Sequence, residues 1–200
     1  MVKEHAGLID GIALTVMEAC RANTNTFGYG IWTHHIQHVA DYARDLARLL
    51  GADQEVVIIA ALLRDYAAIK DPGFIEQHHI HGAAEAERIL QAAGYPEDRI
   101  DLVKKCILSH RSSVRGRMET KEEACLASAD AMAHIEQLAS LFYAVYRELG
   151  MDIDAGRAWV LAKVERDWEK MCAEAKALMR EKYEAIRLLF GGTCCNAGEG

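Results

Sequence analysis

The chain has 200 residues, of which 51% are apolar, and a net charge of −7 at pH 7. This size and composition allow a substantial buried core, which predicts a globular protein. The acidity argues against a general nucleic-acid or membrane-surface binder, because neither polyanion would attract the chain. We expect a cytoplasmic protein, since the longest apolar run, 56–63, is too short to cross a bilayer and residues 1–5 do not resemble a secretory leader.

Apolar residues recur along the chain with the 3.6-residue period of helices, and no useful stretch alternates with period two. The two prolines and several glycines separate these periodic segments. The pattern predicts an all-α fold with helices over 6–21, 32–50, 54–68, 80–93, 96–110, 119–148 and 153–190. Because no repeat or long linker is present, we expect one helical domain over 1–190 and a flexible tail over 191–200.

The last predicted helix, 153–190, carries a short heptad-like seam. Its apolar residues follow a spacing of three and four, namely Leu161, Val164, Trp168, Met171, Ala175 and Leu178. Lys182 then interrupts the seam. So short a seam favours packing of this helix back on its own domain, with a homodimer through the C-terminal helix as the alternative.

The six cysteines show no CxxC spacing and, apart from the terminal pair, lie in apolar helical stretches. They are Cys20, Cys106, Cys125, Cys172, Cys194 and Cys195. This distribution predicts reduced, buried thiols rather than a disulfide framework or a zinc site. Cys194 and Cys195 fall in the glycine-rich tail, where we expect a frayed segment.

Nine histidines are many for this length, and six of them lie within 34–38 and 78–81. Imidazole and carboxylate groups together suit first-row divalent ions. Helical spacing puts four such groups at or within the apolar faces of four predicted helices, namely His35, Asp65, His110 and Asp130. A buried carboxylate must be paired or bind something, and a helical bundle can bring such residues to one internal metal site.

Five segments resemble, in the same order, the motifs of the HD-domain phosphohydrolases: WTHHIQHVA at 32–40, AALLRDYA at 60–67, HHIHGA at 78–83, SHR at 109–111 and SADAM at 128–132. The third and fourth segments resemble those of family members with a second metal. The resemblance covers about residues 30–140 and implies an HD-domain helical bundle, here followed by the long C-terminal helix. One departure stands out, because Arg64 takes the place of the histidine that gives the family its name.

The resemblance implies a two-metal site whose ligands are His35, Asp65 and Asp130 for one ion and Asp65, His78 and His110 for the other. His79 or His81 are alternatives to His78, whose distance from Gly82 fits the motif better. In that family a metal-activated water attacks a phosphate ester or a phosphoanhydride. The expected cofactor is a divalent metal, one of Fe, Mn, Zn, Ni or Co.

Cations that follow the motifs are the predicted contacts of a phosphorylated substrate. We expect Lys70 and Arg111 to act with Asp65 as catalytic residues, and Arg64 and Arg115 to bind substrate. Solvated surface cations are the alternative reading of Lys70, Arg111 and Arg115. The expected partner is a small phosphorylated molecule.

Arg64 decides between several functions, because a guanidinium cannot bind a metal and stays protonated. At about 4 Å it would oppose another unit positive charge by about 4 kcal/mol in a partly polar interior. Arg64 either turns away and leaves a weakened metal site, or pairs with Asp65 or Asp130 and replaces the first metal, or abolishes hydrolysis.

We therefore predict a divalent-metal-dependent phosphohydrolase acting on a nucleotide or another small phosphate ester. The alternative is a non-catalytic HD-fold module that binds a phosphorylated ligand or partner protein. A third reading is a helical interaction protein in which these polar groups simply satisfy one another; the ordered motifs argue against it.

Overall fold

The structure, a computed structural model, describes residues 7–110 and 118–190. Every regular element in these two ranges is helical, which confirms the predicted all-α fold. The α-helices are α1 (Leu8–Arg21), α2 (Gln37–Leu50), α3 (Gln54–Leu63), α4 (Tyr66–Lys70), α5 (His78–Ala92), α6 (Glu97–Ser109), α7 (Lys121–Glu136), α8 (Leu138–Tyr143), α9 (Ile153–Lys170) and α10 (Ala173–Phe190). Two π-helical turns, η1 (Trp32–Ile36) and η3 (Ala144–Glu148), and a 3-10 turn, η2 (Pro72–Phe74), complete them.

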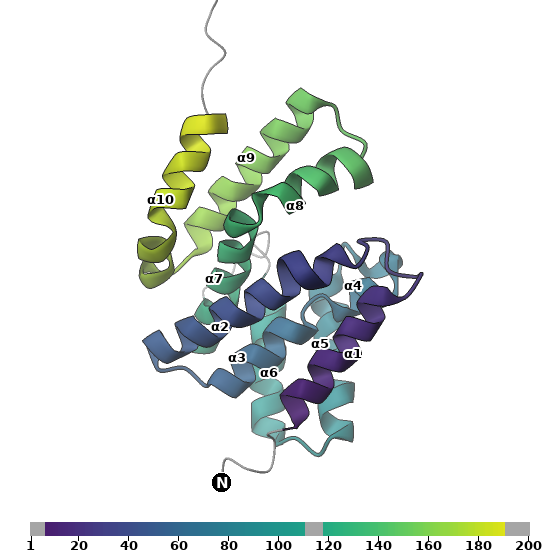
Figure 1. Cartoon of the computed structure of the whole chain (residues 1–200). Helices are drawn as coiled ribbons and strands as arrows, with labels where there is room; N and C mark the ends of the chain where they lie inside the picture. Colours follow the sequence, from purple (N-terminus) through teal and green to yellow (C-terminus); the bar gives the residue numbers. More distant parts are fainter. Residues whose placement is uncertain (1–6, 111–117, 191–200) are drawn as a thin grey trace, which may run out of the picture.

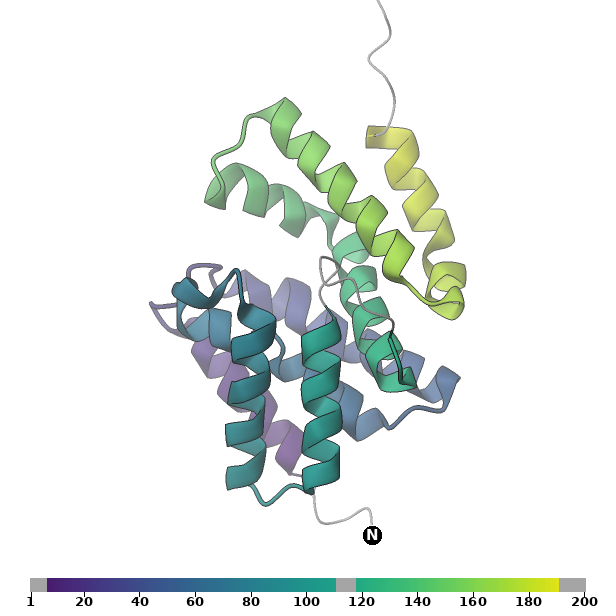
Figure 2. The ribbon, with the colours of Figure 1, turned by 180° about the vertical axis from the view of Figure 1, so that it is seen from behind.

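Helix α3 lies at the centre of the first part of the molecule. Every residue from Val56 to Leu63 is buried, and α3 contacts α1, α2, α5, α6 and α7. Figure 1 shows α1 to α6 together in the lower part, with α8, α9 and α10 above and α7 between the two groups. The view from behind shows α5 and α6 side by side (Figure 2). Because burial of apolar side chains is favourable, this wholly apolar run places α3 in the middle of the core.

Local signals in the sequence fix where α3 and α7 begin. Gly51 ends α2 with a φ of 65°, a left-handed conformation that suits glycine. Asp53 then accepts hydrogen bonds from the amides of the first turn of α3. Thr120 and Glu123 form a capping box at the start of α7. The helices that carry Arg64 and Asp130 are thus anchored at their first residues.

Three predicted helices are divided in the structure. The predicted helix 54–68 ends at Leu63 and resumes at Tyr66, and the predicted helix 119–148 is split into α7, α8 and η3. The predicted single helix 153–190 is two helices, α9 and α10, so the expected long C-terminal helix is corrected to a helical hairpin. No proline or glycine marks this last break, which therefore has a tertiary cause.

Contacts with α7 and within the hairpin explain the break at residue 171. The amide of Cys172 donates to the Ser128 hydroxyl at 3.0 Å, and the rings of Trp168 and Tyr183 stack with centroids 4.0 Å apart. Met171 is buried. These contacts replace the helical hydrogen bonds that the turn gives up.

The heptad-like seam mostly faces the chain's own core. Val164, Met171 and Ala175 are buried, and α9 and α10 both contact α7, as the preference for packing back on the domain expects. Leu178 is 60% exposed. A homodimer through this part of the chain stays a prediction.

The thiols of the described residues are free, as predicted. Cys20, Cys106 and Cys125 are buried, and burial raises the pKa of Cys20 and of Cys125 to about 12. Cys194 and Cys195, like the predicted tail 191–200, lie outside the described residues. Within the described ranges, no helix has the length and apolar character needed to span a bilayer.

Candidate metal centre

A π-helical turn carries His35 into the core side of the molecule. Residues Trp32 to Ile36 form η1, directly before α2. A π-turn inserts an extra residue into the helical repeat and changes the direction of the side chains it carries, and such turns are frequent at functional sites. The His35 ring stacks on His134 of α7, with centroids 4.7 Å apart and an interplanar angle of 16°. The predicted continuous helix 32–50 does not anticipate this turn.

The turn between α3 and α4 presents Arg64 and Asp65, and Gly82 lets α5 approach it. A Cβ atom on Gly82 would lie 2.6 Å from the carbonyl oxygen of Arg64, which is far too close. Only a glycine therefore permits the observed distance between the two backbones. His78 precedes Gly82 by one helical turn and is thereby brought beside Asp65. The H-x-x-x-G spacing has a packing reason in this chain.

Arg64 is fully buried and points inward. Its Nε lies 3.3 Å from Asp130 Oδ1, and its Nη2 lies 3.0 Å from Asp65 Oδ2. Nη2 also donates to His35 Nε2 at 2.5 Å, and Nη1 donates to the Ala61 carbonyl at 2.6 Å. The guanidinium thus lies among the three residues predicted to bind the first metal. One of the sequence-based alternatives, in which Arg64 turns away from the centre, is therefore wrong.

The ligand atoms predicted for the first metal are engaged by the chain's own side chains in this arrangement. The Nε2 lone pair of His35 is used by Arg64, and Asp130 gives one oxygen to Arg64 and the other to Lys170, at 2.8 Å. His134 also lies near His35 and Asp130 at ligand-like distances, but its Nδ1 is engaged 3.0 Å from Asp167 Oδ2. A metal here would add positive charge beside Arg64 and Lys170. His35 and Asp130 are thus partners of the chain's own cations here, and their role as metal ligands stays a prediction.

Buried acids and buried cations balance one another around this centre. Lys170 also pairs with Asp167 at 3.3 Å, and Lys163 pairs with Asp167 at 2.6 Å. Together with Arg64, Asp65 and Asp130, these residues make three acids and three cations. An ion group in a core is tolerated when its charges are matched and hydrogen-bonded. The centre is therefore satisfied by the chain's own side chains.

The pKa values reflect this charge balance. Burial alone would raise the pKa of Asp65, but the Arg64 charge together with His35 and His78 outweighs burial and holds that pKa below its ordinary value. Burial likewise acts against ionisation of Asp130, and the Lys170 and Arg64 charges hold its pKa well below the ordinary range. Burial and the Arg64 charge lower the pKa of His35 to about 4, so His35 is neutral at physiological pH.

His78 and His110 form a second group with Asp65. His78 Nε2 and His110 Nε2 lie 3.3 Å apart, and His78 Nε2 lies 3.9 Å from Asp65 Oδ1. The Nδ1 atom of His78 contacts the Ile75 carbonyl at 2.8 Å, and that of His110 contacts the Ile107 carbonyl at 2.6 Å. A carbonyl only accepts, so each Nδ1 carries the hydrogen and each Nε2 of a neutral ring offers a lone pair.

This second group fits a divalent metal. A cation between these two nitrogens, 3.3 Å apart, satisfies both: a proton would make the contact a hydrogen bond, and a metal ion would accept both lone pairs. Burial lowers the pKa of His110 to about 3, which keeps its ring neutral. Backbone carbonyls commonly hold the second nitrogen of metal-binding histidines in this way. Asp65, His78 and His110 lie within ligand-like distance of one another, as the resemblance implied.

Of the remaining predicted site residues, Lys70 lies within the described part of the chain. Lys70 is 43% exposed in its side chain, pairs with Glu85 at 3.3 Å and lies over the Tyr66 ring. Its ionic partner is thus not a member of the metal centre. Arg111 and Arg115 lie outside the described residues. Of the alternatives to His78, His81 stacks on Phe74 with centroids 3.9 Å apart.

His134 of α7 was missed in the sequence, and so were three residues of the ion network on α9, namely Lys163, Asp167 and Lys170. The three residues of α9 recur with spacings of four and three, which puts them on one side of the helix. Asp167 falls on the stripe that Val160 and Val164 bury, and an acid on an apolar stripe is the signal that could have revealed it.

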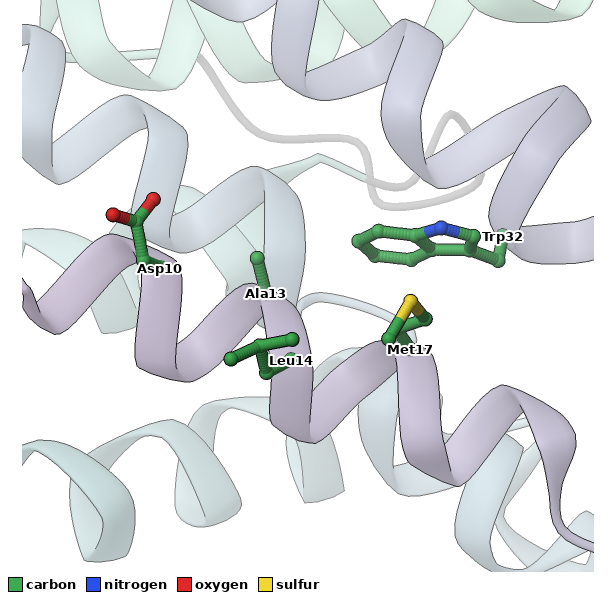
Figure 3. A pocket seen from close by; sticks show the side chains of 5 residues that line it. All are labelled: Asp10, Ala13, Leu14, Met17 and Trp32. Atoms are coloured by element: carbon green, nitrogen blue, oxygen red, sulfur yellow. The ribbon is translucent and has the colours of Figure 1, made fainter.

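A surface hollow of about 310 Å³ lies between α1 and η1. Figure 3 shows the Trp32 indole facing Met17, with Asp10, Ala13 and Leu14 along the same side of α1. Trp32 belongs to the same π-turn as His35, but none of the lining residues belongs to the metal centre. The hollow is therefore not where the polar cluster would meet a ligand.

Comparisons with known proteins agree with this architecture. The family model of the HD domain matches residues 32–135. Two solved structures of YpgQ from Bacillus subtilis are similar, one alone (TM-score 0.68, 24% identity, 90% of this chain and 92% of that one) and one in complex with ADP (0.64, 23%, 90% and 95%). A third, described as a predicted HD superfamily hydrolase from an uncultured Thermotogales bacterium, has a TM-score of 0.53 at 22% identity over 88% of this chain and 92% of that one.

At these identities the solved structures show the fold alone. A comparison with curated proteins gives no significant match. The family model spans just over half of the chain, including every described residue of the centre except those of α9. The chain belongs to the HD-domain family.

Proposed function

We propose that the protein is a phosphohydrolase that depends on one divalent metal per chain, held by Asp65, His78 and His110. The observation that carries this proposal is the pair of Nε2 atoms 3.3 Å apart, each on a ring fixed by a backbone carbonyl. A metal held there would supply a Lewis acid for the negative charge that develops on a phosphoryl group. Three protein ligands leave coordination positions for substrate, as catalytic sites require.

The chain's own residues would prepare this site. Asp65 divides its two oxygens between the two groups, because Oδ2 pairs with Arg64 and Oδ1 faces His78. Arg64 thus holds the carboxylate in one orientation and keeps it ionised. In place of the substrate contact predicted from the sequence, we propose that Arg64 compensates charge, since its Nε, Nη1 and Nη2 all bind protein atoms.

We propose a nucleotide or another small phosphate ester as substrate. The support is twofold: the family is that of the HD domain, and the related fold of YpgQ has been solved with ADP. Arg111 follows His110 directly in the chain and remains our candidate for a phosphate contact, with Arg115 as a second. Lys70 stays a weaker candidate, because it already pairs with Glu85.

A specific observation favours a second candidate function. Arg64 takes the place expected for the first metal, and loss of that metal could leave a module that binds a phosphorylated ligand without hydrolysing it. The two functions differ in turnover and not in binding. Both keep the metal at Asp65, His78 and His110.

Metal analysis and a phosphatase panel test the proposal. We expect the purified protein, loaded with Mn²⁺, Co²⁺, Ni²⁺, Zn²⁺ or Fe²⁺, to bind one ion per chain and to release phosphate from nucleotides or small esters. Binding of an ion and of ADP without turnover on any substrate would favour the binding module. Absence of bound metal under all five conditions would overturn the proposed centre.

A further inference from the structure

We propose that Lys170 is a positioning residue of the metal centre, which sets the geometry of His110 from outside the family-matched region. This inference rests on the proposed function, because it assumes that His110 binds the metal. The family model ends at residue 135, whereas Lys170 is the last residue of α9. The C-terminal hairpin, α9 and α10, would thus complete the site rather than merely cover it.

Lys170 contacts a residue of each polar group, namely Asp130 of the Arg64 group and His110 of the proposed metal group. Its side chain is only 9% exposed, and its Nζ lies 2.8 Å from Asp130 Oδ2 and 3.3 Å from Asp167 Oδ1. The same Nζ donates to the carbonyl oxygen of His110 at 3.3 Å. A single buried ammonium group therefore joins α9, α7 and the end of α6.

The contact with the His110 carbonyl holds the end of α6. The helix ends at Ser109, and the carbonyls of its last turn have no intrahelical donor. A cation at a helix C-terminus satisfies such carbonyls and interacts favourably with the helix dipole. The His110 ring is fixed separately by its bond to the Ile107 carbonyl. Backbone and ring are thus both held, and Nε2 is directed at His78.

The contact with Asp130 completes the pairing of this buried carboxylate. Arg64 binds Asp130 Oδ1 and Lys170 binds Asp130 Oδ2, so both oxygens have a cationic partner. Without Lys170, the freed oxygen would turn toward other donors, and the end of α6 would lose its bond. Both changes would move His110 away from the position that faces His78.

Electrostatics and positioning predict opposite effects of removing Lys170. Removal of a positive charge near the centre would, by Coulomb's law alone, strengthen the binding of a divalent cation. Removal of a positioning contact would weaken it, as the loss of an outer partner of a metal ligand commonly does, by about 10- to 100-fold. The sign of the change in metal affinity therefore decides between them.

The chain offers a matched control in Lys163. Lys163 lies on the same helix, is also largely buried and also pairs with Asp167, at 2.6 Å. Its described contacts are with Asp167 and His134, and not with Asp130 or His110. K163M and K170M thus remove the same group from the same ion network. Only K170M removes the contact with the metal ligand.

The test is a Co²⁺ titration of the full chain, monitored through the visible absorption of the bound ion. It compares the wild type with K163M, K170M and K170R. We expect K170M to weaken Co²⁺ binding by about 10-fold or more and to change the absorption band. K163M and K170R should keep the wild-type band, and K170R should recover most of the affinity. Thermal unfolding of each variant measures folding separately. If K170M does not fold, K170M/D167N, which removes one charge of each sign, replaces it with D167N as control.

Equal or tighter Co²⁺ binding by K170M, or an equal loss in K163M, would overturn the inference while leaving the proposed metal centre intact. If the wild type binds no metal, the proposed function fails, and only the structural part of the inference, that Lys170 sets the geometry of His110, is then decided on the metal-free protein by ¹⁵N spectra of the histidine rings. Those spectra should show His110 with hydrogen on Nδ1 in the wild type and K163M, and a mixture of tautomers in K170M. Unchanged His110 signals in K170M would contradict it.

Discussion

The two polar groups of the centre share Asp65 but differ in how they are satisfied. Around Arg64, all three guanidinium nitrogens and both oxygens of Asp130 have partners from the chain, and acids and cations are equal in number. Around His78 and His110, two nitrogen lone pairs face each other and a carboxylate oxygen. The first group is complete without a ligand, whereas the second is arranged to receive a cation. Arg64 thus lies in a group that its own ion pairs satisfy, beside a group that we propose binds a metal.

If the two groups differ in this way, the largest loss of metal binding should follow from a change at His110. H110A removes one of the three proposed ligands. Loss of an outer partner of a metal ligand lowers metal affinity by about 10- to 100-fold, and we expect H110A to lower it further. Phosphate release should fall to background. H35A is the matched control, because His35 accepts from Arg64 and is not a ligand of the proposed metal, so the metal affinity of H35A should stay close to that of the wild type. Isothermal titration with Zn²⁺ measures both; an equal loss in the two variants would remove the distinction between the groups.

Loss of Arg64 should mainly affect folding stability. R64L leaves Asp65 and Asp130 buried with one cation fewer, and breaking a buried pair costs about 3 to 5 kcal/mol. Urea unfolding measures this change. R48L is the control, since Arg48 is 60% exposed and its pair with Asp45 is a surface pair of little energetic value. Similar stabilities of R64L and R48L would show that Arg64 is not a structural replacement.

A histidine at position 64 should convert the structural group back into a binding group. R64H removes a guanidinium from among His35, Asp65 and Asp130 and supplies an imidazole that can bind a metal. We expect the metal content to rise from one ion per chain toward two, measured by elemental analysis after dialysis. A content that stays at one would show that Lys170 or the geometry, and not Arg64 alone, prevents the second ion.

The pH dependence of stability should follow the buried acids. Burial acts to raise the pKa of Asp167, but His134, Lys170 and Lys163 outweigh it, so the folded-state pKa is lowered. A lowered folded pKa gives stability that is complete above the unfolded pKa of about 3.9 and is lost as the pH falls through the folded pKa. The free energy of unfolding should therefore decline below about pH 5.

D167N tests this dependence. We expect a loss of about 3 kcal/mol at neutral pH, because Lys163 and Lys170 lose a shared partner, together with a shallower decline toward acid. Asp65 and Asp130 keep part of the decline, since their pKa values are also lowered. Urea unfolding at several pH values measures both features. An unchanged slope in D167N would contradict the role of Asp167 in the ion network.

Much of the fold and half of the centre could be predicted from the sequence. The apolar periodicity placed α5 and α6 close to their observed bounds, and it placed the starts of α3 and α7 but not their ends. The convergence of Asp65, His78 and His110 followed from the family motifs. These features depend on local periodicity and on residue types at fixed spacing, which a single sequence displays.

The remaining features depend on contacts between distant residues. The break at Met171 depends on the bond from Cys172 to Ser128, and the orientation of Arg64 depends on Ala61, His35 and Asp130 together. The heptad-like seam predicts the apolar side of α9, but it does not predict that Lys170 on the same helix contacts Asp130. No local pattern encodes such pairings. Tertiary contacts decide them.

The packing that brings the two groups together gives the last and smallest prediction. In G82A the added Cβ would lie 2.6 Å from the Arg64 carbonyl, so α5 must move away from the turn that carries Asp65. We expect a loss of about 1 to 3 kcal/mol in stability, as is usual for overpacking, and weaker metal binding because His78 moves with α5. The control is G11A. Gly11 lies in α1, and a Cβ added there would meet no neighbouring atom within 4 Å, so alanine should stabilise the chain by about 0.5 to 1 kcal/mol. If G82A is as stable as G11A and binds metal as the wild type does, the close approach of α5 is not what holds His78 beside Asp65.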